Sequence, residues 1–154
     1  MKNFPSIPGN GAAPGLEFIN QTDESIPVAD PLLKEILQQM EKSFGVRFQM
    51  IELVYVDENE IVRINREFLG KEYITDIITF PYHDPGSTEI EGTLFCCAPR
   101  IVEQSRELGT ESRQEFYRVF IHGMLHLCGF DDATPGEKEK MSELENNFLN
   151  KINL

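Results

Sequence analysis

The sequence has few cysteines, and this shortage excludes two ways of holding a small fold together. Its three cysteines, Cys96, Cys97 and Cys128, cannot form an even disulfide framework, and two of them are adjacent and therefore poor partners. No CxxC pair is present, which argues against a cysteine zinc site. We expect the cysteines to be small core residues in a reducing compartment.

The sequence also has no long apolar run. No stretch approaches the ~20 apolar residues that a membrane-spanning helix needs. The first residues, "MKNFPSIPGNGAAPG", do not contain the continuous apolar segment of a secretory signal. These two features predict a cytoplasmic protein that does not bind a membrane.

Basic residues are scarce. There are 14 Lys and Arg residues against 26 Asp and Glu residues, and the formal net charge is −12. Nucleic-acid-binding proteins usually have a basic surface because neutralising phosphates supplies much of their affinity. The charge therefore argues against this class, although a local basic groove or a metal ion could still meet a phosphate. Such a groove would be lined by Arg47, Arg63, Arg66 or Lys71.

The length of 154 residues fits one domain. Residues 1–14, rich in Pro, Gly and Ala, are expected to form a flexible arm, and residues 15–154 a single domain. Strands are predicted over 15–20, 46–57, 73–83 and 92–99, and helices over 29–45, 58–69, 99–108, 111–128 and 134–152. Asp30 is the expected N-cap of the first helix. The mixture predicts an α+β fold with one small mixed sheet of about four strands packed against helices.

Two of the three histidines lie in the most apolar predicted helix. Between Val119 and Cys128 the only polar side chains are those of His122 and His126. A spacing of four residues places both rings on one face, ~40° apart and ~6 Å along the axis. Both imidazoles can then bind one metal ion at the end of this buried helix, and zinc is the favoured ion.

The residues after the helix can complete this site. Gly129 can take the left-handed conformation that ends a helix, so that the chain folds back toward the histidines. Asp132 is the predicted third ligand, and Asp131 could replace it or orient a ligand. The alternative is a hydrogen-bonded histidine pair with Asp131 or Asp132 as its partner. His83, in a predicted turn, is expected to be an exposed loop residue.

Two stretches resemble the YbeY family. "HGMLHLCGFDD" is similar to its pattern H-G-x-L-H-L-x-G-[YF]-D-H, and "INREFLGKEYITDIITFPY" is similar to L-N-x-x-x-R-G-K-x-x-x-T-D-V-L-S-F-P. The resemblance extends from Gly15 to the C-terminus. It implies a single α+β domain, a zinc ion held by three histidines, and a metal-dependent, single-strand-specific endoribonuclease. It also implies a role in maturation of rRNA, chiefly at the 3′ end of the small-subunit RNA, with the small ribosomal subunit or assembly factors as partners.

This sequence departs from the family pattern at two site positions. The third histidine falls on Asp132, a residue that can still bind zinc but adds a negative charge. The family arginine falls on Leu69, so that Lys71 and Arg66 are the predicted sources of positive charge near the metal. Both are also ordinary candidates for solvated surface charge. Lysine binds phosphate less well than arginine does, because it cannot form the bidentate contact.

Thr75 and Asp76 match the second motif, and Thr79 replaces its serine. They are either site residues or residues that set the turn and the strand register. Asp131 is the candidate for an acid–base role.

Two other functions remain open from the sequence. One is a zinc hydrolase with another substrate, although Gly123 stands where HExxH peptidases have their glutamate base. The other is a non-catalytic ribosome-assembly factor with a structural metal. One zinc per chain is expected, but nickel, iron or manganese could also bind two histidines and one carboxylate.

Overall fold

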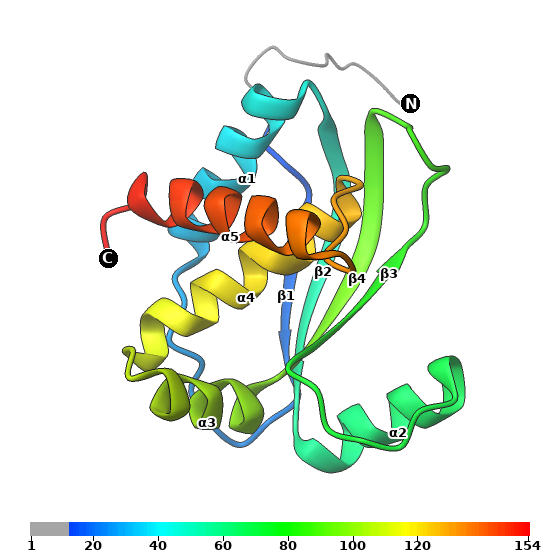
Figure 1. Ribbon diagram of the computed structural model, residues 1–154, viewed down its shortest axis with the longest axis vertical. Helices are drawn as coiled ribbons and strands as arrows, with labels where there is room; N and C mark the ends of the chain where they lie inside the picture. Colours follow the sequence, from blue (N-terminus) through cyan, green and yellow to red (C-terminus); the bar gives the residue numbers. More distant parts are fainter. Residues whose placement is uncertain (1–12) are drawn as a thin grey trace.

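The computed structural model describes residues 13–154 and has the predicted α+β architecture (Figure 1). The elements in chain order are β1 (Leu16–Asn20), α1 (Asp30–Phe44), β2 (Arg47–Val56), α2 (Glu58–Leu69), β3 (Ile77–Pro81), β4 (Glu89–Cys97), α3 (Ala98–Leu108), α4 (Ser112–Leu127) and α5 (Pro135–Asn150). The predicted N-terminal arm lies almost wholly outside the described residues, and its boundary stays a prediction. Within residues 13–154, no helix is both long and apolar enough to span a bilayer.

The four strands form one mixed sheet in the order β1-β2-β4-β3. Strand β2 is parallel to both β1 and β4, whereas β3 pairs with β4 in the antiparallel sense. Leu53 of β2, for example, lies between Phe18 of β1 and Leu94 of β4. The prediction of one small mixed sheet is therefore confirmed.

The sheet is covered on both faces. Leu53 and Tyr55 of β2 belong to the larger core, which α1, α3, α4 and α5 complete. The alternate residues Val54 and Val56 point to the opposite face and pack against α2. Figure 1 shows α4 and α5 crossing in front of the strands, with α2 set apart at the lower right. This arrangement places the end of α2 and the end of α4 on either side of β3.

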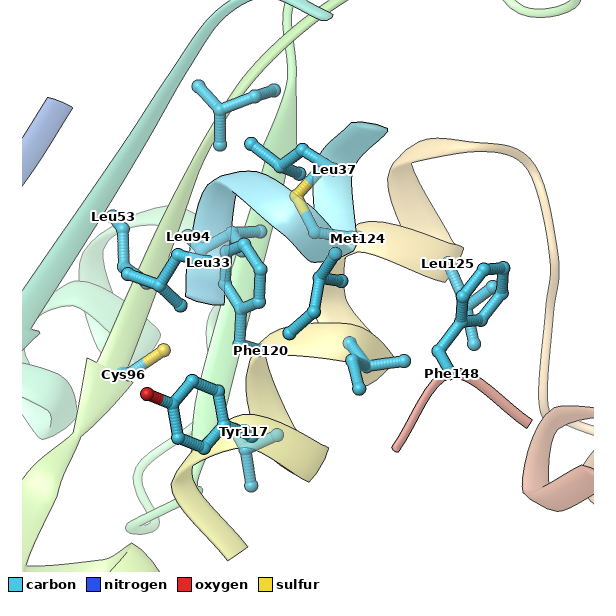
Figure 2. Close-up of a cluster of buried hydrophobic side chains, with 14 of the residues drawn as sticks. Leu33, Leu37, Leu53, Leu94, Cys96, Tyr117, Phe120, Met124, Leu125 and Phe148 are labelled. Carbon is cyan, nitrogen blue, oxygen red and sulfur yellow. The ribbon is translucent and has the colours of Figure 1, made fainter. Parts of the chain in front are cut away.

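Helix α4 is the central buried element of the larger core. Phe120, Met124 and Leu125 are completely buried, and Figure 2 shows them among side chains from α1, the sheet and α5. The helix approaches the sheet closely at Gly123, where an added Cβ would lie 2.5 Å from Ile77 Cδ1 and 3.1 Å from Leu94 Cδ2. Gly123 therefore fixes the distance between α4 and the strands β3 and β4.

Several predicted boundaries differ from the observed ones. Asp30 is the first residue of α1, and its N-cap is Ala29, which makes no side-chain capping bond. The strand predicted from residue 73 begins at Ile77, where pairing with β4 begins. The carbonyl of Tyr73 instead accepts a hydrogen bond of 2.9 Å from the Asn65 side chain of α2. This contact ties the loop before β3 to α2, and the Asp76 carbonyl, which accepts from the Cys97 amide at 2.8 Å, is the first contact with β4.

Candidate metal centre

The two histidines of α4 point toward one position at the end of the helix. The distance between His122 Nε2 and His126 Nε2 is 3.1 Å. Each side chain is 26% exposed, so that the rings lie at the edge of the core with one side open. Their spacing of four residues produces this convergence, as the sequence predicted.

The chain reverses at Gly129, which has a φ of 101°. The amide of Phe130 donates to the carbonyl of Leu125, and that of Gly129 to the carbonyl of His126, both at 3.0 Å. This pair of hydrogen bonds is the Schellman pattern of a helix end with a glycine in the left-handed conformation. Phe130 then packs on Phe44 of α1, with ring centres 5.1 Å apart. The turn therefore carries the following acidic residues back toward the histidines.

Asp132 completes a group of three potential ligands. Its carboxylate oxygens lie 3.3 Å from His122 Nε2 and 3.6 Å from His126 Nε2. One ligand atom from each of the three residues lies within 4.8 Å of the other two. A regular tetrahedron with bonds of ~2.0–2.1 Å has ligand atoms about 3.3–3.4 Å apart. The residues present therefore fit a zinc-sized ion, with one tetrahedral position left for water or substrate.

Glu145 of α5 is a site residue that the sequence analysis missed. Its Oε2 lies 2.7 Å from His122 Nδ1, on the side of the ring away from Asp132. Its Oε1 lies 3.3 Å from Arg118 Nη1, and the carboxylate is only 10% exposed. A carboxylate in this place orients a metal-binding imidazole and fixes its tautomer. The available signal was its position between Met141 and Phe148 on the buried face of α5.

The surroundings of His122 shift its pKa in opposite directions. Burial lowers the pKa, while the hydrogen bond and charge of Glu145, followed by the charges of Asp132 and Asp76, raise it. The net result is a pKa above the ordinary value. In the metal-free protein the ring therefore holds a proton more strongly than a free imidazole does, and a metal ion must displace this proton.

A second set of polar contacts connects the site with α3. Gln104 donates from Nε2 to Asp76 at 3.1 Å and to Glu115 at 2.8 Å. Arg118 lies between Glu115, at 3.8 Å, and Glu145. These contacts hold the carboxylates of Asp76, Glu115 and Glu145 in place around His122.

The three candidate ligands line a cleft of about 660 Å³ between α2, β3 and α4. Its other lining residues are Asn65, Leu69, Lys71, Tyr73, Thr75, Asp76, Ile77, Ile78, Thr79 and Pro81. Thr75, Asp76 and Thr79, which the second motif supplies, therefore lie in the same cleft as the histidines. The two motifs are far apart in the sequence and meet here.

The predicted catalytic residues are only partly brought together. Lys71 lines the cleft, whereas Arg66 and Asp131 are not among its lining residues. The guanidinium of Arg66 instead lies 3.3 Å from Glu72. Asp131 is exposed and makes no side-chain hydrogen bond or ion pair with the residues of the described chain. The catalytic roles of Arg66 and Asp131 stay predictions without a supporting contact.

His83 differs from its prediction as an exposed loop residue. It is half-buried, and its Nε2 lies 3.1 Å from the carbonyl of Leu127 at the end of α4. Its Nδ1 lies 3.0 Å from the carbonyl of Glu91 on β4. His83 therefore ties the segment after β3 to the end of α4, a tertiary contact that its turn-like sequence surroundings did not indicate.

No basic groove forms from the four expected cations within the described chain. Arg63 is paired with Glu60 and Glu67, and Arg47 lies 3.8 Å from Glu41. Within the cleft, Lys71 is the only Lys or Arg among the lining residues, against the carboxylates of Asp76 and Asp132. Leu69, at the position of the family arginine, contributes an apolar wall.

Comparisons with known proteins show the family of this chain. The family model described as Endoribonuclease YbeY matches residues 18–153. The chain is 38% identical over 137 residues to the endoribonuclease YbeY of Chlorobaculum parvum, covering 89% of this chain and 94% of the relative. It is 37% identical over 115 residues to that of Bacteroides thetaiotaomicron, covering 75% and 82% of the two chains.

The fold has a solved counterpart. The solution structure of TM1509 from Thermotoga maritima matches with a TM-score of 0.57 and 24% identity. The match covers 87% of this chain and 86% of that one. The likeness supports the fold, and the family model together with the curated relatives establishes the family. This chain belongs to the YbeY endoribonuclease family.

Proposed function

We propose that the protein is a metal-dependent endoribonuclease that cuts single-stranded RNA during rRNA maturation, at the 3′ end of the small-subunit RNA. The observation that carries the proposal is the convergence of His122, His126 and Asp132 at one end of a cleft. Membership of an endoribonuclease family supplies the substrate class and the reaction type. We further propose that the protein acts in the cytoplasm on the small ribosomal subunit or with its assembly factors.

His122, His126 and Asp132 would hold the metal, for which zinc is our first choice. A bound zinc ion supplies a Lewis acid at this end of the cleft. Glu145 accepts the Nδ1 proton of His122, which leaves Nε2 free to bind. Because the third ligand is a carboxylate, the site carries one more negative charge than three histidines would. The Lewis acidity of the ion is then reduced.

Lys71 is the residue that we propose to bind the phosphate next to the cleavage point. Its ammonium is the positive side chain among those that line the cleft. A lysine acts on a phosphate as a point charge, without the bidentate contact of an arginine. With Leu69 in place of the arginine, we expect phosphate binding in this protein to be weak and to depend on the metal.

The alternatives are less favoured. A peptidase of the HExxH kind needs a glutamate beside the first histidine, but position 123 faces Ile77 and Leu94. A glutamate there would enter the packing between α4 and the sheet. A non-catalytic assembly factor would use the same metal as a structural element, and it would tolerate loss of a ligand as long as the fold survived.

The test is cleavage of a short single-stranded RNA and of its duplex by protein stripped with a chelator and reloaded with zinc. We expect the zinc-loaded protein to cut the single strand but not the duplex, and the stripped protein to cut neither. His126→Ala should cut neither RNA. Asp84→Asn, which changes an exposed carboxylate outside the cleft, is the control and should remain active. Zinc-loaded protein that binds RNA without cutting it would instead support the assembly factor. Cleavage that persists in His126→Ala would contradict a catalytic metal.

A further inference from the structure

Large apolar side chains are exposed together at one edge of the cleft. Phe68 is 61% exposed, Leu69 48%, Tyr73 54% and Ile74 41%. They occupy the end of α2 and the loop that follows it, within a segment of seven residues. We call this group, Phe68, Leu69, Tyr73 and Ile74, the apolar rim. Exposed clusters of this kind mark binding surfaces more often than single exposed side chains do.

Two members of the apolar rim line the cleft that holds the candidate metal centre. Leu69 and Tyr73 line the same cleft as His122, His126 and Asp132. The ammonium of Lys71 lies 5.9 Å from the centre of the Tyr73 ring. An aromatic plane, a cation and the candidate metal ligands are thus arranged in one cavity.

The position of Tyr73 is fixed through its backbone. The side chain of Asn65, only 1% exposed, donates to the Tyr73 carbonyl at 2.9 Å. Asn65 is held in α2, so that the loop is anchored while the ring itself stays open to solvent. A ring presented in this way can receive a flat ligand without a costly ordering of the loop.

The few positive charges of the cleft favour RNA contacts that do not depend on phosphate charge. Its lining supplies one ammonium against two carboxylates, and the whole chain carries a formal charge of −12. Most RNA-binding sites gain affinity from several phosphate contacts. Unpaired bases can instead stack on an aromatic side chain, an interaction that is not sequence-specific and does not involve the phosphate charge.

We propose that Tyr73, flanked by Leu69, forms a subsite that stacks an unpaired nucleobase of the RNA beside the phosphate that Lys71 meets. This inference rests on the proposed function for the identity of the ligand. A base within a duplex is covered on both faces, so the subsite selects unpaired nucleotides. It also gives a role to the leucine that replaces the arginine, because an apolar wall beside Tyr73 favours a base over a phosphate.

The test measures, by fluorescence anisotropy, how tightly a short 2′-O-methylated single-stranded RNA binds to the zinc-loaded protein. A strand of the same length with abasic sites keeps the phosphates and removes the bases. We expect Tyr73→Ala to weaken binding of the normal strand ~10- to 100-fold, and Tyr73→Phe to change it less than about twofold. The abasic strand should bind wild type and Tyr73→Ala equally weakly.

Tyr82 supplies a matched control. It is also an exposed tyrosine, 63% exposed, and it does not line the cleft. Tyr82→Ala should therefore bind like the wild type. Tyr73→Trp adds a direct readout, because the chain has no other tryptophan. Its emission should be quenched by the normal strand and not by the abasic one.

The outcomes separate this inference from the proposed function. Equal binding by Tyr73→Ala and wild type, equal binding of the normal and abasic strands by wild type, or no RNA binding at all would overturn the subsite. If His126→Ala loses zinc-dependent cleavage while Tyr73→Ala keeps the wild-type KM for single-stranded RNA, the nuclease is supported and the base-stacking subsite is contradicted. Base-dependent binding that Tyr73→Ala loses, together with no cleavage of the unmodified single strand by zinc-loaded wild type, would support the subsite and overturn the nuclease.

Discussion

Glu145 should control the metal affinity of the site although it touches no metal. Its carboxylate accepts the Nδ1 proton of His122 at 2.7 Å and is 10% exposed. Removing this carboxylate leaves Nδ1 of His122 without a hydrogen-bond acceptor. The imidazole ring is then free to rotate away from His126 and Asp132. Loss of such a partner typically lowers metal affinity 10- to 100-fold, which corresponds to ~1.4–2.7 kcal/mol.

Two substitutions of Glu145 separate the contribution of its hydrogen bond from that of its negative charge. Glu145→Ala removes both the acceptor and the charge, and we expect a loss near 100-fold. Glu145→Gln keeps an oxygen that can accept the Nδ1 proton, so we expect a loss nearer 10-fold. The remaining partners of Arg118, which include Asn146 at 3.1 Å, keep its guanidinium from being left without an acceptor in either variant.

The assay is competition for zinc with a chromophoric chelator at fixed pH. Glu143→Ala is the matched control, since Glu143 is an exposed carboxylate on the same helix. Thermal unfolding of the metal-free variants separates a loss of fold from a loss of affinity. If Glu145→Ala is folded and its zinc affinity is within twofold of the wild-type value, Glu145 does not control metal binding.

Three further predictions follow from the structure. Gly123→Glu should lower the free energy of unfolding by about 3 kcal/mol or more, because a charged side chain would be buried against Ile77. It should also give no peptidase activity. Thermal unfolding and a peptide-cleavage assay check these two results. Lys71→Gln should raise the KM for single-stranded RNA about 10-fold and reduce its salt dependence, since one charge-assisted phosphate contact is lost; unchanged kinetics would remove Lys71 from the site. Burial raises the pKa of Cys97 to about 11 and that of Cys128 to about 12. Because the thiolate is the reactive form, both cysteines should be alkylated at pH 8 at least ~100-fold more slowly than a thiol of ordinary pKa. The rate should increase as the pH rises. Mass spectrometry measures the labelling, and rapid labelling at pH 8 would contradict the prediction.

The local part of the site could be predicted from the sequence. The pairing of His122 and His126 depends only on helical periodicity, and the reversal at Gly129 depends only on the freedom of glycine. Asp132 then lies within a few residues of a known turn. Each of these inferences concerns neighbours in the chain, where local geometry decides the outcome.

The rest depends on tertiary packing. Glu145 meets His122 because α5 crosses α4, and nothing in the local sequence of α5 sets that crossing. The strand predicted from Tyr73 has suitable β-branched and aromatic residues. In the structure the Tyr73 carbonyl is bound by the Asn65 side chain of α2, and the pairing with β4 begins only at Ile77. Tertiary contacts overrode local propensity there.

The charged residues were the least predictable. Arg66 is five residues before Lys71 in the sequence, but it does not line the cleft, and its guanidinium lies 3.3 Å from Glu72 instead. A sequence does not state which of several nearby carboxylates a long flexible side chain will meet. Acidic residues are abundant in this chain, so free cations are rare around its site.

The proposed function depends first on the joint binding of one metal ion by His122, His126 and Asp132. The most direct measurement is elemental analysis of protein purified without a histidine tag, for the wild type, His126→Ala and Asp132→Ala. We expect about one zinc per chain in the wild type and a large loss in both variants while the fold is retained. Wild-type protein that stays free of metal after incubation with zinc, or variants that keep the full amount, would contradict this joint binding.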